Sequence, residues 1–211
     1  FKDCCNIKIL EKSKLLKKIQ KKKIKDKKVK WLNDLNELNS LPCIFIANEF
    51  FDALPIKQFI KIKNKWHERY VNFANNKKPE FLDIPFDMKK LEKKIKFIIS
   101  SKQKFIEYSP LTSEYLKKIT NKIKVNDGGI LIIDYGYMNH KMKNTLQAIS
   151  KHKYSSVLSN FGNSDITYNL NFNLINQIIK KLGPFFQSTT TQKQFLTRLG
   201  ILKRAEMLSK N

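Results

Sequence analysis

The sequence is poor in arginine and in long apolar runs, and each shortage argues against a class of protein. Of its 211 residues, 42 are basic, but only three of these are arginine. Arginine makes the bidentate contacts to phosphates and bases. The net charge of +24 therefore indicates a broad lysine bias rather than a dedicated nucleic-acid binder. No apolar run approaches the ~18 residues of a membrane span.

Cysteine and histidine are also scarce, three of each. Cys4 and Cys5 are adjacent and Cys43 is distant, so no C-x-x-C pair or disulfide framework is present, which is typical of a reducing compartment. The histidines show no spacing typical of metal ligands, and we predict no metal site. The chain begins with Phe1 without a recognisable signal peptide, and we expect it to start partway into a fold.

What the sequence does contain is an alternation of short apolar runs and amphipathic segments. Strands are expected at 6–10, 29–32, 44–46, 105–108, 130–133 and 185–191, and helices at 12–30, 86–101, 111–123, 173–182 and 194–208. Two alternating runs, 56–62 and 66–73, flank a short polar turn and predict a β-hairpin, followed by a loop at 75–85. Alternating strands and helices predict an α/β fold with a mostly parallel sheet and helices on both faces.

The segment 12–30 is the densest basic part of the chain. Leu15, Leu16, Ile19 and Ile24 recur in it at roughly helical spacing, which predicts an amphipathic helix with a basic outer face. Its lysines either form a solvated face or bind a polyanion or an acidic partner, and the sequence leaves both alternatives open.

Three of the predicted strands end in polar clusters that contain acids: Glu11, then Asn48, Glu49 and Asp52, and then Asp134 with Tyr135. In an open α/β sheet, ligands bind at the carboxyl ends of the strands. The three clusters together therefore predict a site at one edge of the sheet. The alternative is that Asn48 caps a helical turn while Glu49 and Asp52 face water.

The run ANEFFDALP at 47–55 resembles the signature of the MidA family of methyltransferases. Further matching motifs follow in order: WHER at 66–69, EYSP at 107–110, GGILIIDYGY at 128–137 and DIT at 165–167. The resemblance covers nearly the whole chain. It implies a Rossmann-like class I methyltransferase fold that uses S-adenosylmethionine, with one domain over 1–211, a hairpin insertion at about 56–73 and a C-terminal strand and helix at about 183–211.

The same resemblance implies that this domain is truncated at its N-terminus, because the first strand and the glycine-rich loop of the family are expected before residue 1. It makes 6–10 the second strand. Glu11 then becomes the acid that hydrogen-bonds the ribose hydroxyls of the cofactor, and Asn48 also becomes a cofactor-binding residue. A solvated cap to the basic helix is the alternative for Glu11.

The activity that the resemblance implies is methyl transfer to a guanidinium nitrogen of a protein arginine. Arginine is always protonated, and carboxylates can hold its planar fork in bidentate fashion. The predicted catalytic residues are Glu49, Asn48, Asp52 and Glu107, and the predicted substrate-binding residues are Asp134, Tyr135, Asp165 and Thr167. An Asx-type turn is the alternative for Asp165 and Thr167.

The implied partner is an acceptor protein, with a respiratory complex I subunit as one candidate, in the bacterial cytoplasm or in the mitochondrial matrix. The first alternative is a catalytically inactive relative that acts as an assembly or scaffold protein. A basic protein that binds nucleic acid without specificity is the less favoured alternative. The sequence predicts no oligomeric state.

Overall fold

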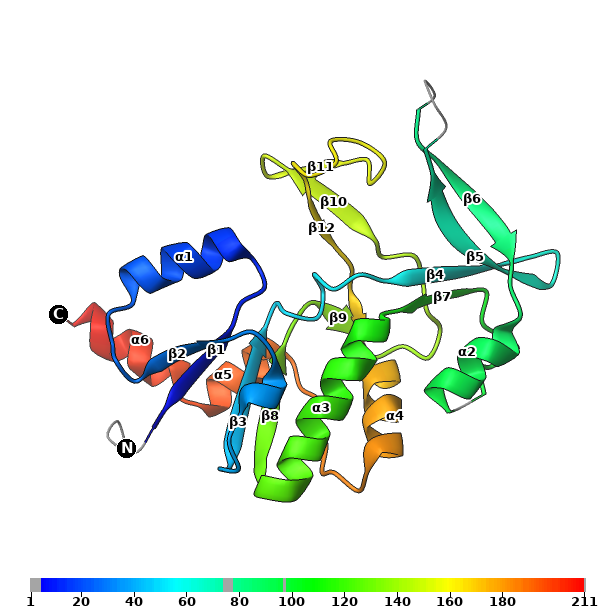
Figure 1. Ribbon diagram of the computed structural model, residues 1–211. Coiled ribbons are helices and arrows are strands. Elements are labelled where there is room, and N and C mark those ends of the chain that lie inside the picture. Colours follow the sequence, from blue (N-terminus) through cyan, green and yellow to red (C-terminus); the bar gives the residue numbers. More distant parts are fainter. Residues whose placement is uncertain (1–4, 74–77, 97, 211) are drawn as a thin grey trace. The chain divides into compact units, whose positions relative to one another are not determined.

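The protein is described by a computed structural model that covers residues 5–73, 78–96 and 98–210 (Figure 1). The chain divides into two compact units. Unit 1 comprises residues 1–45 and 118–129, and unit 2 comprises residues 46–117 and 130–211. The single domain expected over residues 1–211 stays a prediction.

Unit 1 begins with a strand–helix–strand element. Its parts are β1 (Ile7–Leu10), α1 (Lys14–Lys23) and β2 (Val29–Leu32), which is followed by a short 3-10 helix, η2 (Leu35–Glu37). β1 and β2 pair in parallel, from Ile7 opposite Val29 to Leu10 opposite Leu32. A parallel pair requires a crossover connection, and α1 is that connection. Both strands predicted from the sequence are confirmed.

The helix α1 is shorter than the predicted 12–30, and its orientation differs from the prediction. Ser13 caps its first turn, because the Ser13 hydroxyl accepts a hydrogen bond from the Leu16 N–H at 3.2 Å. No residue of α1 is buried, and Leu15 is 67% exposed. The prediction of an apolar inner face with a basic outer face is therefore wrong. The physical reason is that polar side chains make the helix–sheet contacts: Trp31 Nε1 donates to Gln20 Oε1 at 2.9 Å.

The next strands are β3 (Cys43–Asn48) and β8 (Gly128–Ile133), which pair with each other. Within unit 1 the Cys43 N–H donates to the Asp127 carbonyl, and within unit 2 the Glu49 N–H donates to the Ile133 carbonyl. The predicted strands 44–46 and 130–133 are confirmed. Each is longer than predicted: β3 ends at Asn48, the first residue of one polar cluster, and β8 ends directly before Asp134.

A four-stranded antiparallel sheet in unit 2 contains the predicted hairpin. Its strands are β4 (Lys57–Ile62), β5 (Lys65–Asn72), β6 (Glu80–Pro85) and β7 (Phe105–Tyr108), in the order β6-β5-β4-β7. The loop predicted at 75–85 is wrong for residues 80–85, which form β6, while 75–77 lie outside the described residues. Arg69 on β5 holds Asp83 on β6 through two hydrogen bonds of 2.8 and 2.9 Å, which fixes the register.

The part of unit 2 after β8 contains five short strands. The strands are β9 (Gly136–Tyr137), β10 (Gln147–Ser150), β11 (Lys153–Ser155), β12 (Asp165–Thr167) and β13 (Leu170–Asn171). β9 and β13 pair in parallel, and β10 pairs with β11 and β12 in antiparallel fashion. The mixed α/β class is confirmed. The described strands form five small sheets, however, rather than the one mostly parallel sheet that the sequence predicts.

The helices of unit 2 differ from prediction mainly at their ends. They are α2 (Met88–Ile95), α3 (Pro110–Asn126, continuing into unit 1), α4 (Phe172–Leu182), α5 (Gln192–Arg198) and α6 (Ile201–Ser209). The final helix predicted at 194–208 is divided because Gly200 takes the left-handed conformation, with φ of 83°. The strand predicted at 185–191 does not form, because the Phe185 N–H turns back to the Gly183 carbonyl and Phe186 is 94% exposed.

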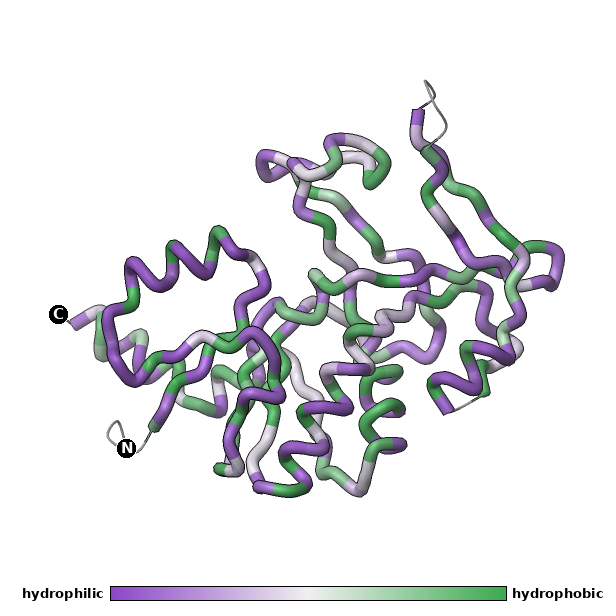
Figure 2. The backbone as a smooth tube through the Cα atoms, viewed as in Figure 1, coloured by the Kyte–Doolittle hydropathy of each residue, from purple (hydrophilic) through white to green (hydrophobic). Residues whose placement is uncertain are grey.

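Two apolar clusters form the core of unit 2. The first joins Phe51, Leu116 of α3 and Leu170 to α4, along which hydrophobic residues recur (Figure 2). The second joins the four-stranded sheet to α2 through Phe59, Ile106 and Leu91. The first cluster includes Phe51, so it anchors the segment that follows β3.

Candidate active site

The turn after β3 separates its aromatic residues from its acids. Phe51 is fully buried in the first apolar cluster, and Phe50 packs edge-on against Tyr115 with ring centroids 5.0 Å apart. Glu49 is exposed and has a φ of 45°, a left-handed conformation that costs a non-glycine residue about 1–3 kcal/mol. The packing of the two phenylalanines holds the backbone of this turn in place.

Asp134, directly after β8, binds the backbone of the same turn from the neighbouring strand. Its Oδ2 accepts hydrogen bonds from the backbone N–H groups of Phe51 at 3.2 Å and Asp52 at 3.3 Å. Its Oδ1 accepts from the Tyr135 N–H at 2.8 Å. The two strand ends predicted to share an edge of a sheet therefore lie together within unit 2.

Asp52 lies in this turn with a carboxylate oxygen that has no partner. The residue is 5% exposed, and within the described part of the chain its Oδ1 has no hydrogen-bond donor. Burial raises the pKa of Asp52, and the charges of Glu49 and Asp165 raise it further. A buried carboxylate oxygen without a donor is costly, although the backbone N–H of Ala53 acts to lower the pKa of this carboxyl group. A ligand that brings a positive charge or hydrogen-bond donors would relieve that cost.

Asp134 shares this electrostatic environment. Burial, and then the neighbouring charge of Asp52, raise its pKa to about 6, although three backbone N–H groups act in the opposite direction. Two acids this close resist simultaneous ionisation. With Glu49 and Asp165 nearby, the region has an excess of negative charge in a chain that is otherwise strongly positive.

The segment 165–171 closes the other side of the acidic region. Its Tyr168 N–H donates to the Asp52 carbonyl at 3.2 Å, and its Leu170 N–H donates to the Tyr135 carbonyl at 2.8 Å. Close approach here depends on Gly136, because a Cβ at this position would lie 2.4 Å from the Leu170 carbonyl oxygen.

The predicted substrate-binding residues Asp165 and Thr167 occupy this closing segment. Asp165 is exposed, and the half-buried Thr167 accepts a hydrogen bond from Gln147 Nε2 at 3.1 Å. Both belong to β12, so the Asx-turn alternative is wrong. Asn48 and Tyr135 are exposed beside the acids, at the ends of their strands.

Tyr168 is a residue of this region that the sequence reasoning missed. It is 7% exposed, and burial raises its pKa to about 12. Its position directly after the Asp165-x-Thr167 motif was the available signal. The sequence gives no indication that Tyr168 is buried while Tyr135, also in a motif, is 61% exposed.

Glu107 on β7 is buried, and both of its carboxylate oxygens accept hydrogen bonds from the fold. Its carboxylate accepts hydrogen bonds from Gln58 Nε2 at 2.9 Å, from the Thr145 N–H at 2.9 Å and hydroxyl at 2.5 Å, and from the Leu146 N–H at 3.2 Å. The Thr145 hydroxyl oxygen in turn accepts from the Asn169 N–H at 2.9 Å. Glu107 thus connects β7 to the segment that closes the acidic region.

Glu11 belongs to unit 1. Its Oε1 accepts from the Ser13 N–H at 2.8 Å and its Oε2 from Gln20 Nε2 at 3.0 Å. A carboxylate has about four acceptor positions, so two remain for further donors. The half-buried Glu11 at the end of a parallel strand therefore fits the two hydroxyls of a ribose.

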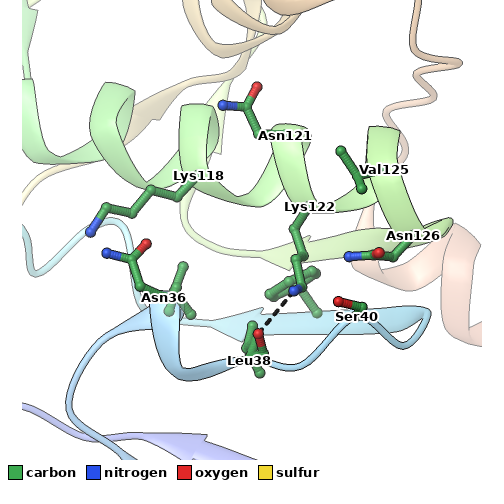
Figure 3. A pocket seen from close by; sticks show the side chains of 10 residues that line it. Asn36, Leu38, Ser40, Lys118, Asn121, Lys122, Val125 and Asn126 are labelled. Carbon is green, nitrogen blue, oxygen red and sulfur yellow. Dashed lines mark hydrogen bonds between the residues drawn. The ribbon is translucent and has the colours of Figure 1, made fainter.

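A separate cavity of about 400 Å³ lies in unit 1, between α3 and the segment after η2 (Figure 3). Lys122 reaches across it, and its Nζ donates to the Leu38 carbonyl at 2.9 Å. None of the predicted site residues lines this cavity.

The described residues contain no cluster of three or more potential metal-ligating side chains. Over the same ranges, no helix is long and apolar enough to cross a bilayer.

Comparisons with known proteins give a family and a fold. A family model described as “Putative S-adenosyl-L-methionine-dependent methyltransferase” matches residues 1–188. The mitochondrial protein arginine methyltransferase NDUFAF7 of Xenopus tropicalis is 29% identical over 196 residues, which cover 84% of this chain and 41% of that protein. Its homologue in Caenorhabditis elegans is 28% identical over 180 residues, covering 84% and 42%. The chain thus spans about two-fifths of the length of these curated relatives.

Two solved structures from Burkholderia thailandensis share the fold. An uncharacterized protein superposes with a TM-score of 0.75 at 20% identity, covering 97% of this chain and 56% of its own. A member of the same superfamily, bound to S-adenosyl-homocysteine, superposes with a TM-score of 0.74 at 21% identity, covering 97% and 54%. This chain therefore shares the mixed α/β fold of these two structures.

Proposed function

The chain belongs to the MidA family, whose cofactor is S-adenosylmethionine, and on this premise we propose that it methylates an arginine of an acceptor protein. The observation that carries the proposal is the Oδ1 of the buried Asp52, beside Asp134, for which the described residues supply no hydrogen-bond donor. A guanidinium group presents planar donors and a permanent positive charge. It supplies both things that this carboxylate lacks.

In the proposed reaction, Asp52 and Glu49 hold the guanidinium of the acceptor. Two carboxylates that bind the donors on one side of the group concentrate its positive charge there. The electron pair of the remaining nitrogen is then more available for attack. Positioning of this kind removes part of the entropic barrier to a reaction between two bound groups.

Asp52, together with Asp134, would also receive the proton that the reaction releases. The attacking nitrogen forms a bond to carbon and loses one of its own protons, so the arginine keeps a single positive charge. Asp134, with a pKa of about 6, and the raised pKa of Asp52 suit a pair of acids that takes up this proton near neutral pH.

The cofactor, when bound, supplies the methyl group on a positively charged sulfur. We assign its ribose hydroxyls to Glu11, which keeps two free acceptor positions, and we retain Asn48 as a cofactor-binding residue. Tyr135, Asp165 and Thr167 keep their proposed role in substrate binding. Glu107 receives a positioning role rather than a catalytic one, because both of its carboxylate oxygens already accept hydrogen bonds from other parts of the fold.

The names of the curated relatives support arginine as the acceptor residue and a protein as the acceptor. A respiratory complex I subunit is the candidate that follows from the MidA resemblance. The mitochondrial matrix, or the bacterial cytoplasm, would be the matching compartment.

The test is transfer of labelled methyl groups from S-adenosylmethionine by the full-length protein to arginine peptides and to matched lysine peptides. We expect transfer to arginine alone, and a loss of about a hundredfold or more on Asp52→Asn and on Glu49→Gln. The exposed Glu206→Gln is the control and keeps full activity. Cofactor binding without transfer to any arginine acceptor would contradict the proposal and would favour an assembly or scaffold protein.

A further inference from the structure

The orientation of α1 is fixed by its polar side. Gln20 bridges Glu11 and Trp31, with distances of 3.0 and 2.9 Å. Lys17 Nζ donates to Asn33 Oδ1 at 2.7 Å, and Lys21 Nζ lies 5.7 Å from the centre of the Trp31 ring. These contacts all involve β1, β2 or the residues directly after them. The helix therefore has a defined polar face toward its own strands.

The opposite side of α1 carries its apolar residues. Leu15 is 67% exposed, Leu16 49% and Ile19 40%. At about 100° per residue these three fall within one third of the helix circumference, and Lys17, Gln20 and Lys21 fall on the other side. Turning polar side chains toward the strands and leaving leucines exposed is the reverse of the usual arrangement for a surface helix. An arrangement held by specific hydrogen bonds indicates that the apolar stripe has a partner.

Lysines surround the apolar stripe. On the helix, Lys18, Lys22 and Lys23 are exposed and project next to it, and Lys25 and Lys27 are exposed in the segment that follows. No acidic residue lies within α1. Long lysine side chains can lay their aliphatic stems along an apolar surface and keep the charge outside it.

We propose that α1 docks on the surface of an anionic membrane, lying in the plane of the headgroups. A short apolar stripe bordered by lysines is the pattern of helices that bind at such interfaces. The negative lipid headgroups complement the lysines, and the outer part of the acyl region covers Leu15, Leu16 and Ile19. Nucleic acid would match the charge but would leave the apolar stripe in water.

The charge makes the larger contribution to this interaction. Each lysine near an anionic surface strengthens binding about fivefold, so Lys18, Lys22 and Lys23 together contribute about a hundredfold. Three partly inserted aliphatic side chains contribute about tenfold or more. Binding should therefore require anionic lipid and should fall with salt, because exposed charges are screened over about 10 Å at 0.1 M ionic strength.

The experiment is vesicle sedimentation with the purified chain. One set of vesicles is pure phosphatidylcholine, and the other contains phosphatidylglycerol as well. We expect binding to the second set only, weakened at high salt. The triple variant Leu15→Gln, Leu16→Gln, Ile19→Gln should bind at least about tenfold more weakly, and Lys18→Gln, Lys22→Gln, Lys23→Gln about a hundredfold more weakly.

A matched control distinguishes the effect of the α1 stripe on vesicle binding from the effect of exposed apolar residues elsewhere. Leu202, Met207 and Leu208 of α6 are 70%, 57% and 58% exposed, and their replacement by Gln should leave vesicle binding unchanged. Retention of binding by the α1 apolar variant would overturn the proposal. Equal binding to both kinds of vesicle would also overturn it. So would a result in which the lysine substitutions weaken binding to duplex DNA but leave vesicle binding unchanged.

Discussion

Two carboxylates of unit 2, Asp52 and Glu107, are each 5% exposed, yet their surroundings are opposite. Glu107 accepts four hydrogen bonds from Gln58, Thr145 and Leu146. Asp52 has an oxygen with no donor in the described part of the chain, and other acids lie around it. Burial alone therefore does not distinguish a structural acid from one that faces a ligand. The number of hydrogen-bond donors around the carboxylate distinguishes the two.

Glu107 can stabilise the surroundings of Asp52 through a chain of hydrogen bonds. The hydrogen bonds to Glu107 fix Thr145, and Thr145 holds Asn169 in the segment that closes the acidic region. Asp52 remains unsatisfied because nothing in that segment donates to its Oδ1. A site that must bind a cation gains from such preorganisation, because the cost of the unpaired charge is met on folding rather than on binding.

The largest effect should come from removing the satisfied acid. Glu107→Ala leaves several buried donors without an acceptor, and we expect it to lower the free energy of unfolding by about 3–5 kcal/mol. Denaturant unfolding measures this loss. Glu206→Ala, which removes an exposed i,i+4 pair with Lys210, is the control and should cost less than about 0.5 kcal/mol. If Glu107→Ala lowered the free energy of unfolding as little as the control does, Glu107 would not be a structural acid.

A smaller effect should appear in the pH dependence of stability. The pKa of Asp134 is about 6 in the folded chain and about 4 in an unfolded one, so the folded chain binds this proton more tightly. The free energy of unfolding should therefore fall by about 2–3 kcal/mol as the pH rises from about 4 to about 6. Asp134→Asn should remove this contribution. The same slope in the variant and the wild type would refute the assignment.

The smallest effect on stability should come from Asp52→Asn. Oδ1 has no donor to lose, and the substitution removes repulsion from Asp134, so the free energy of unfolding should change by less than about 1 kcal/mol. Methyl transfer should nevertheless be lost. Thermal unfolding and the transfer assay on the same preparation measure both. A loss of several kcal/mol would make Asp52 a structural residue like Glu107.

The strand ends and the hairpin were predictable from the sequence because they depend on local patterns. The run 44–46 before Asn48 and Glu49, and the run 130–133 before Asp134, are short and apolar and end in polar residues. Two alternating runs around a short polar turn likewise predict β4 and β5. The polar residues at 48–52 and 134–135 were placed near one another on this basis, and within unit 2 they are.

The remaining features depend on contacts between distant segments. β6 was missed because its pairing with β5 uses an Arg69–Asp83 contact that the alternation of 80–85 does not reveal. The orientation of α1 could not be read from its periodicity, because periodicity shows that a helix has two faces but not which one meets the sheet. The different surroundings of Glu107 and Asp52 depend on Thr145, which lies 38 residues from Glu107.

The most direct test of the central claim is a carboxyl-carbon NMR titration of Asp134 with and without blocked arginine amide. The proposed site predicts that saturating arginine moves the Asp134 midpoint below about 6, because a bound guanidinium favours the ionised pair. Blocked lysine amide should shift it less, and Asp52→Asn should abolish the arginine effect. An unchanged midpoint in the presence of arginine would contradict the assignment of Asp52 and Asp134 to the acceptor guanidinium.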